Sequence, residues 1–284
     1  MSYDPDYCNV EYNPRLSVPD HADYFAHWAE RSRATRLGEP CYLDIPYGEA
    51  PGQRLDMFPA RRARHGSVPL FIFIHGGYWR ALDKSDFSYI APSFTRAGAA
   101  VAMINYRLVP EVPLEELVRD VLGAITWCYL HSGQYGVDPQ HLYVGGHSAG
   151  GHLTAMMLAC EWPRWHGALP PNVVKGGLAI SGLFDLEPIM HASFLNDDLR
   201  LTPERVAALS PAWMKPATHA PLITAVGGSE SDEFKRQTRV IGHQWAGVLK
   251  EDIALPGLNH FSICDALANP GSALHRAAVQ MMGL

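Results

Sequence analysis

The sequence predicts an α/β fold in which a mostly parallel central sheet is flanked by helices. Short apolar runs rich in Val, Ile and Ala recur along the chain, at residues 69–75, 99–106, 141–146, 173–181, 221–228 and 251–256. Their lack of polar alternation indicates strands that are buried on both faces. Amphipathic helical stretches separate the runs, and strands that alternate with helices form a parallel sheet.

Two shorter strands and a helix are predicted ahead of these runs. Residues 41–47 and 52–60 read as strands that are joined by a Gly/Pro turn. Residues 20–38 predict a helix that Asp20 caps, with Gly38 just past its end. Between the later strands, the sequence predicts helices at 113–133, 148–160 and 233–249.

Residues 186–220 interrupt this alternation with a proline-containing interval that can hold one or two short helices, such as one over 202–209. An insertion over the strand ends is typical of a lid or cap. We therefore predict a single domain over residues 1–284, with an N-terminal helical extension at 1–40 and a cap-like insertion at 186–220. Together, these two segments would roof the site.

The composition favours a cytoplasmic globular enzyme that acts on a small molecule. Charged residues make up 18% of the chain, the net charge is −6, and no basic block is present to bind nucleic acid. No apolar run approaches the ~20 residues of a membrane span, so we expect no membrane partner. The five cysteines are scattered, without a CxxC pair, and the N-terminus predicts no secretory signal. Reduced thiols in a cytoplasm fit this pattern.

The motif Gly146-His147-Ser148-Ala149-Gly150 follows one predicted strand and begins a helix. This is the context of a nucleophile elbow, a tight turn that holds a serine exposed at the end of a strand. The helix N-terminus adds free N–H groups and a positive dipole end, which favour a developing oxyanion. We predict that Ser148 is a catalytic nucleophile, the alternative being a glycine-rich turn with a capping serine.

A second glycine motif, His75-Gly76-Gly77-Tyr78-Trp79, follows the first core strand. Esterase loops of the HGGG type supply backbone N–H donors to a carbonyl oxygen under attack. The predicted oxyanion donors are the N–H groups of Gly77 and Tyr78, together with that of Ala149 after the nucleophile. His75 is expected to shape the loop, and Tyr78 and Trp79 are predicted to line the substrate pocket or to support the loop.

A serine hydroxyl needs a base, and the order for this fold is serine, acid, histidine. Among the candidate histidines, His260 is the one that sits in a loop after the last core strand, so we predict it as the base. His141, His147 and His152 lie too near the elbow in sequence, and His243 falls in a predicted helix.

Three carboxylates compete for the place of the acid. Glu230 is favoured because it lies nearest the end of its strand, from where it can point toward His260. Asp232 and Asp185 remain open, although acids at the start of a helix commonly cap it, as Asp232 would. Neither a zinc-binding spacing nor a nucleotide-binding glycine motif is present, so no metal and no cofactor are predicted.

These motifs, together with residues 12–36, 181–186 and 227–237, resemble α/β-hydrolases of the kynurenine formamidase (arylformamidase) type, related to the hormone-sensitive-lipase-like esterases. By this resemblance, the nucleophile falls on Ser148, the base on His260, and the acid, usually Asp, on Glu230. The resemblance implies an α/β-hydrolase fold and a serine hydrolase that cleaves N-formyl aryl amides such as N-formylkynurenine. A carboxylesterase for small aryl or short-chain acyl esters and a non-catalytic ligand-binding protein are the alternatives. A homodimer is compatible with the resemblance.

Overall fold

An eight-stranded sheet forms the centre of the molecule, in the order β1-β2-β4-β3-β5-β6-β7-β8. The computed structural model describes residues 3–61 and 68–284. The strands are β1 (Tyr42–Pro46), β2 (Arg54–Phe58), β3 (Leu70–Ile74), β4 (Ala100–Ile104), β5 (Leu142–His147), β6 (Val174–Ile180), β7 (Leu222–Gly227) and β8 (Leu249–Leu255). β2 pairs antiparallel with β1 and β4, and all other neighbours are parallel. The predicted mostly parallel sheet is thus confirmed.

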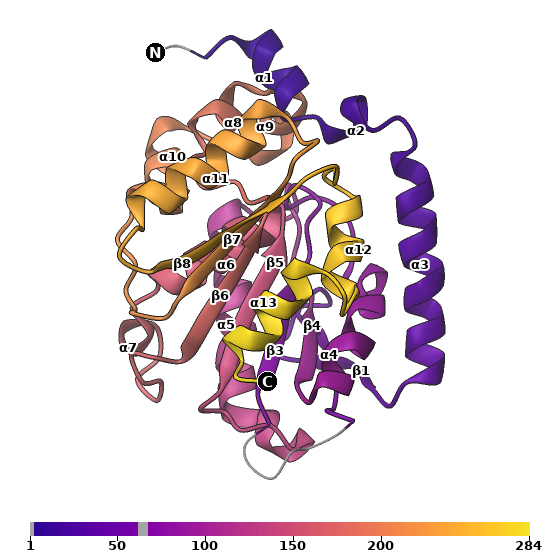
Figure 1. Ribbon diagram of the computed structural model, residues 1–284. Coiled ribbons are helices and arrows are strands. Elements are labelled where there is room, and N and C mark those ends of the chain that lie inside the picture. The colour runs from indigo at the N-terminus through magenta and orange to yellow at the C-terminus, as the bar shows by residue number, and fades with distance from the viewer. Residues whose placement is uncertain (1–2, 62–67) are drawn as a thin grey trace.

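Helices cover both faces of this sheet (Figure 1). They are α1 (Pro5–Glu11), α2 (Pro14–Ser17), α3 (His21–Gly38), α4 (Ala91–Ala97), α5 (Leu114–His131), α6 (Ala149–Ala159), α7 (Trp162–Trp165), α8 (Glu187–His191), α9 (Ser193–Leu199), α10 (Pro203–Leu209), α11 (Asp232–Gln244), α12 (Ser262–Ala268) and α13 (Ala273–Met281). Among the described helices, none is long and apolar enough to cross a membrane.

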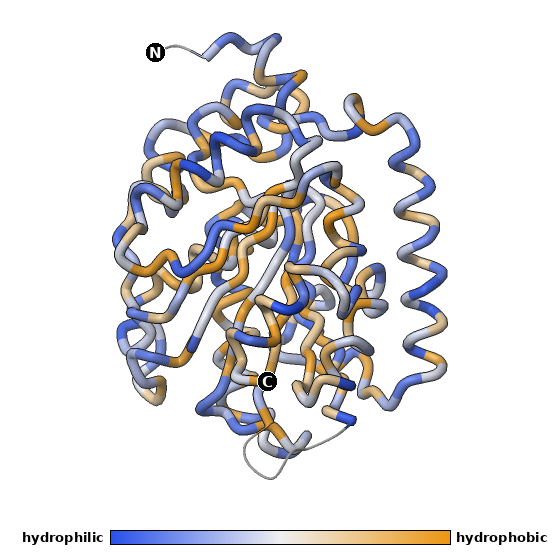
Figure 2. The backbone as a smooth tube through the Cα atoms, in the orientation of Figure 1, coloured by the Kyte–Doolittle hydropathy of each residue, from blue (hydrophilic) through white to orange (hydrophobic). Residues whose placement is uncertain are grey.

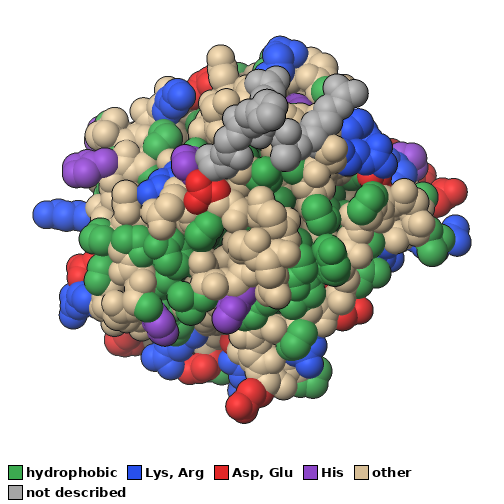
Figure 3. Space-filling view, turned by 90° about the horizontal axis from the view of Figure 1, so that it is seen from below, with side chains coloured by type: hydrophobic (Ala, Val, Ile, Leu, Met, Phe, Trp, Pro, Cys, Tyr) green, Lys and Arg blue, Asp and Glu red, His purple; other side chains and the backbone are tan. Residues whose placement is uncertain are grey.

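Alternate side chains of the strands enter two separate cores. Along β3, Leu70, Ile72 and Ile74 belong to the core under α5 and α6, whereas Phe71 and Phe73 belong to the core under α4, α12 and α13. Figure 2 shows the apolar strands at the centre and a mixed, largely polar α3 outside. Burial on both faces explains why the core strands read as continuous apolar runs. On the face drawn in Figure 3, cationic and anionic side chains are interspersed around the rim.

The N-terminal helix differs in detail from its prediction. Asp20 occupies the N-cap position, but its side chain makes no capping hydrogen bond. Gly38 is the last helical residue rather than the first one outside, because the N–H of Glu39 still donates to the carbonyl of Thr35. The helix buries Trp28 and Ser32 and contacts the short 3-10 turns at Lys84–Asp86 and Ser88–Ile90.

Residues 186–220 contain three short α-helices, α8, α9 and α10, where one or two were predicted. The first two contact α1, so the N-terminal segment and the insertion meet. Figure 1 shows α1, α2, α8 and α9 at the end of the sheet toward which the parallel strands run. Loops that carry chemistry gather at this end of a parallel sheet.

Candidate active site

Ser148 lies in a tight turn between β5 and α6. Its backbone has φ +57° and ψ −117°, a left-handed conformation that a serine adopts only under strain. The turn has no room for side chains on the flanking glycines. A Cβ at Gly150 would come within 1.9 Å of the carbonyl oxygen of Ile74, and one at Gly146 within 2.3 Å of the Gly150 oxygen. These contacts explain the glycine-rich sequence around Ser148.

The loop after β3 also has an unusual backbone. Gly77, Tyr78 and Trp79 have φ values of +105°, +51° and +59°. A Cβ at Gly77 would clash with the carbonyl oxygen of Ala81 at 2.1 Å. Within the described chain, the backbone N–H groups of Gly77, Tyr78 and Ala149 donate no hydrogen bond. The three predicted oxyanion donors are therefore all free to bind an oxygen atom.

His75 and Trp79 support this loop from behind. The His75 ring stacks on Tyr106 at 4.4 Å, and burial lowers its pKa. Trp79 does not line the cavity described below, so its prediction as a pocket residue is corrected. Its fully buried indole N–H needs an acceptor and donates to Nδ1 of His152 at 3.2 Å. The other ring nitrogen of His152 bonds the Leu209 carbonyl at 2.8 Å.

Glu230 and His260 come together behind Ser148. Oε2 of Glu230 lies 2.6 Å from Nδ1 of His260, and neither residue is more than 6% exposed. The other carboxylate oxygen, Oε1, accepts hydrogen bonds from the Ser181 hydroxyl at 2.6 Å and from the Gly227 N–H at 2.7 Å. The Glu230 carboxylate is thus fixed in place by donors on three different loops or strands.

The competing acids lie elsewhere. Asp232 is exposed in the first turn of α11, 3.7 Å from Nζ of Lys235. Asp185 is buried and pairs with Arg236 at 3.1 Å. Within the described chain, Glu230 is the one carboxylate that hydrogen-bonds or ion-pairs with His260. Glu230 therefore occupies the place of the acid, and Asp232 and Asp185 do not contact the histidine.

The rings of His147, Phe234 and Phe261 contact the His260 ring, although the sequence predicts no role for His147. The ring centroids of His147 and Phe234 lie 4.5 and 4.4 Å from that of His260. Burial and the neighbouring His260 lower the pKa of His147 well below its usual value, so its ring is neutral. Its position before the nucleophile was the only signal for this contact.

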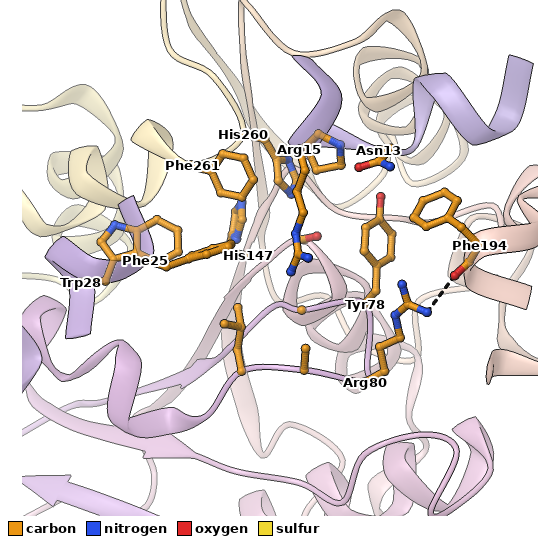
Figure 4. A pocket seen from close by; sticks show the side chains of 15 residues that line it. Asn13, Arg15, Phe25, Trp28, Tyr78, Arg80, His147, Phe194, His260 and Phe261 are labelled. Atoms are coloured by element: carbon orange, nitrogen blue, oxygen red, sulfur yellow. Dashed lines mark hydrogen bonds between the residues drawn. The ribbon is translucent and has the colours of Figure 1, made fainter. Parts of the chain in front are cut away.

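Ser148 and His260 face one cavity of about 130 Å³ (Figure 4). Within the described chain, they make no hydrogen bond to each other, and such bonds are often long or poorly aligned before a substrate binds. Tyr78, Phe261 and His147 also line the cavity, and from the insertion only Phe194 does. The N-terminal segment contributes Asn13, Pro14, Arg15, Phe25 and Trp28. Sequence reasoning predicted a roof here but none of these residues.

Comparisons with known proteins identify the family of this chain. Kynurenine formamidase of Danio rerio is 30% identical over 98% of this chain and 94% of its own length. The chain belongs to the kynurenine formamidase family of α/β-hydrolases. Residues 55–162 also match the BD-FAE family model. A carboxylic ester hydrolase of Mycobacterium tuberculosis is 35% identical over 47% of the chain and 37% of its own length.

A solved structure of similar sequence has the same architecture. A Silicibacter protein, provisionally described as a thioesterase, superimposes with a TM-score of 0.84 at 30% identity, over 97% of this chain and 98% of its own. The relatives of the present chain are a kynurenine formamidase and an ester hydrolase, so this member of the kynurenine formamidase family is a hydrolase.

Proposed function

We propose that this enzyme hydrolyses N-formyl aryl amides of the N-formylkynurenine kind through a formyl-enzyme intermediate on Ser148. One observation carries the proposal: a strained serine, a histidine backed by a buried carboxylate, and the donor residues Gly77 and Tyr78 line one cavity. The kynurenine formamidase relatives support the formamide as substrate. The aromatic walls formed by Phe25, Phe261 and Tyr78 suit an aryl leaving group.

The first half of the reaction acylates the serine. Glu230 holds the His260 tautomer that carries its proton on Nδ1, which leaves the Nε2 lone pair free to accept a proton. Ser148 Oγ attacks the formyl carbon as its proton passes to His260. The N–H groups of Gly77, Tyr78 and Ala149 bind the oxyanion. The C–N bond then breaks, and His260 returns the proton to the leaving aryl amine.

The second half releases the acyl group. Water attacks the formyl ester of Ser148 and gives its proton to His260. The oxyanion forms again at the same donors, the ester bond breaks, and His260 returns the proton to Ser148 Oγ. Formic acid leaves and ionises, and the free enzyme is restored.

Short-chain or aryl ester hydrolysis is the second candidate. The same residues perform it, with an alcohol in place of the amine, and the Mycobacterium ester hydrolase among the relatives favours it. The two activities are separated by the leaving group and the size of the acyl group. A formyl group occupies less space beside Ser148 than a butyryl group does.

A substrate panel tests both candidates. We expect hydrolysis of N-formylkynurenine with kcat/KM at least about tenfold above those for p-nitrophenyl acetate and butyrate, a difference of ~1.4 kcal/mol in barrier. Ser148→Ala should lower turnover of every substrate by about 10⁴-fold or more. Fast ester turnover beside slow formamide turnover would replace the formamidase proposal by the esterase one. A Ser148→Ala protein with wild-type turnover would refute both.

We also infer that the enzyme works in the cytoplasm. All five cysteines are free thiols, three of them buried, as expected in a reducing compartment. Cell fractionation with activity measured in each fraction tests this inference, and recovery of the activity outside the cytoplasmic fraction would contradict it.

A further inference from the structure

The cavity above Ser148 contains two guanidinium groups and no carboxylate on its described walls. The guanidinium groups belong to Arg15 and Arg80. Glu230 and Asp198 contact the lining residues His260 and Arg80, but neither acid is part of the wall. A cavity with an excess of one charge attracts ligands of the opposite charge.

Arg80 is already neutralised. Its Nη1 pairs with the Asp198 carboxylate and donates to the carbonyl oxygen of Phe194 at 2.7 Å. Asp198 and Phe194 both belong to α9 in the insertion, so this guanidinium ties the loop after β3 to the insertion. Figure 4 shows Arg80 turned toward Phe194. Its role is explained by contacts within the protein.

Arg15 has no such partner. Within residues 3–61 and 68–284, its guanidinium makes no ion pair and no hydrogen bond, and it lies over the ring of Phe25 at 5.6 Å. In Figure 4 its side chain points into the cavity and ends, in this view, between His147 and Tyr78. Stacking on an aromatic face leaves the edge of a guanidinium free to donate hydrogen bonds.

The backbone that carries Arg15 is fixed before a substrate arrives. The hydroxyl of Tyr12, three residues earlier, donates to Oε2 of Glu233 at 2.5 Å, and the Tyr78 hydroxyl donates to the Tyr12 carbonyl. The Ser231 hydroxyl donates to the Glu11 carbonyl at 2.7 Å. These bonds attach the segment to α11 and to the loop after β3. A positioned backbone lowers the entropy cost of using Arg15 for binding.

We propose that Arg15 binds a carboxylate on the leaving group of the substrate, and so selects aryl formamides that carry a carboxylate over neutral ones. The inference rests on the proposed function, because it assigns a substrate class to the same site. The planar fork of a guanidinium matches both oxygens of a carboxylate. Bound in this way, the anion would hold the aryl group beside Phe25 while the formyl group reaches Ser148. Arg15 is a binding residue and takes no part in proton transfer.

A matched pair of substrates tests this assignment. N-formylkynurenine and its carboxamide differ only in the charge of the group that Arg15 would bind. We expect the wild type to prefer the acid, and Arg15→Gln to lower kcat/KM for the acid by about 10- to 100-fold, mainly through KM. The same variant should change kcat/KM for the carboxamide by less than about twofold. Arg15→Lys should restore part of the preference, because it keeps the charge but loses the fork.

Two controls separate binding from general effects. Arg33→Gln removes an exposed cation of α3 that makes no ion pair in the described chain and does not line the cavity, and it should leave both substrates unchanged. Added salt should raise KM for the acid in the wild type and have little effect in Arg15→Gln. Equal losses for acid and carboxamide in Arg15→Gln, or no preference in the wild type, would overturn the inference while the formamidase activity stands.

Failure of the proposed function gives a different result. If the wild type hydrolyses neither formamide but hydrolyses esters, the formamidase proposal fails. Hydrolysis of 4-acetoxybenzoate and 4-acetoxybenzamide, an acid and its carboxamide, then tests whether Arg15 binds a carboxylate. Loss of the preference for the acetoxybenzoate in Arg15→Gln would support carboxylate binding in an esterase, and an unchanged preference would refute it.

Discussion

The floor and the roof of the cavity are built in different ways. The floor consists of the loop at 75–79, the turn at 147–149, Glu230 and His260, and short polar contacts fix its parts. The roof consists of residues 13–28 of the N-terminal segment and Phe194. It presents aromatic rings and a guanidinium that has no ion-pair partner among the described residues. The acid and the base of the floor thus hydrogen-bond to each other, whereas the roof, within the described chain, leaves one cation for a ligand.

This difference assigns the two halves separate tasks. Groups that transfer protons and bind an oxyanion must be held in one geometry, which the contacts of the floor provide. Groups that choose a substrate need complementary shape and charge rather than an exact angle of attack. Changes to the floor should therefore lower kcat for all substrates, and changes to the roof should alter the ratio between substrates.

The largest effect is expected from the acid of the floor. Glu230→Gln keeps the size of the side chain but removes the charge that faces Nδ1 of His260 at 2.6 Å. We expect kcat to fall by about 10³- to 10⁴-fold for every substrate, because the imidazole loses the correct tautomer and its charge partner. Asp232→Asn, at an exposed position, should change kcat by less than about twofold. Similar losses in both variants, measured as kcat for the acid and the carboxamide, would contradict the assignment of Glu230.

His152 joins Trp79 of the floor to Leu209 of the insertion, and the pH dependence of the free energy of unfolding tests this connection. His152 accepts from Trp79 and bonds the Leu209 carbonyl, and burial lowers its pKa from 6.5 to about 4. The unfolded chain therefore binds a proton on this residue at higher pH than the folded one does. The free energy of unfolding should fall as the pH falls from about 6.5 toward 4.

His152 alone should account for a loss of about 2 kcal/mol between pH 7.5 and pH 5. Urea unfolding of the wild type and of His152→Gln at both pH values measures it. The wild type should lose about 2 kcal/mol more than the variant over this interval. Equal losses in the two proteins would show that His152 takes up its proton at a similar pH in both states.

A smaller effect is expected at Ser181, which supports Glu230 of the floor and for which the sequence predicts no role. Ser181→Ala removes the hydroxyl that donates to Oε1 of Glu230 at 2.6 Å and leaves the Gly227 N–H in place. We expect kcat to fall about tenfold with KM unchanged, because the carboxylate loses one of the hydrogen-bond donors that fix its orientation. The exposed Ser193→Ala serves as the matched hydroxyl deletion. A rise in KM without loss of kcat would contradict this role and would indicate that Ser181 contributes to substrate binding.

The smallest effect is expected at a hydrogen bond that joins the loop after β3 to the N-terminal segment. Tyr78→Phe deletes the hydroxyl that donates to the Tyr12 carbonyl but keeps the aromatic wall. We expect a loss of about 1 kcal/mol in the free energy of unfolding and a decrease of a few-fold in kcat/KM. Tyr129→Phe removes a hydroxyl that accepts a hydrogen bond from Gln140 and does not line the cavity, so it gives the baseline for the free energy of unfolding. A change confined to the ratio of acid to carboxamide would place Tyr78 functionally in the roof.

The floor could be predicted because local patterns determine it. Continuous apolar runs located the core strands, and Ser148 and Glu230 follow their strands by one and three residues. The glycines near Ser148 could be read because the turn excludes a Cβ, as the 1.9 Å approach at Gly150 shows. Trp79 was placed wrongly because its sequence neighbours do not reveal His152, the acceptor that its N–H finds across the core.

The roof could not be predicted because its contacts are far apart in the sequence. Tyr12 meets Glu233 and Gln237 across more than 220 residues, and no periodic pattern links the two segments. α3 is mostly exposed, so its composition does not show which side faces the site. Arg15 looked like any surface arginine. Only the folded chain shows that it points into the cavity and has no acidic partner in the part of the chain that the structure describes.

The N-terminal segment supplies five of the cavity's lining residues in one continuous stretch, while the insertion supplies only Phe194. The residues that select the substrate can therefore be exchanged together, as one segment of the chain. Exchange of roughly the first thirty residues between two such hydrolases would transplant a roof without altering a strand of the sheet. The donor needs a tyrosine at the position of Tyr12 to reach Glu233, whereas the backbone carbonyl of any residue there can accept the Tyr78 hydroxyl. Homologous enzymes could thus diverge in substrate by changing their beginnings while their chemistry stays the same.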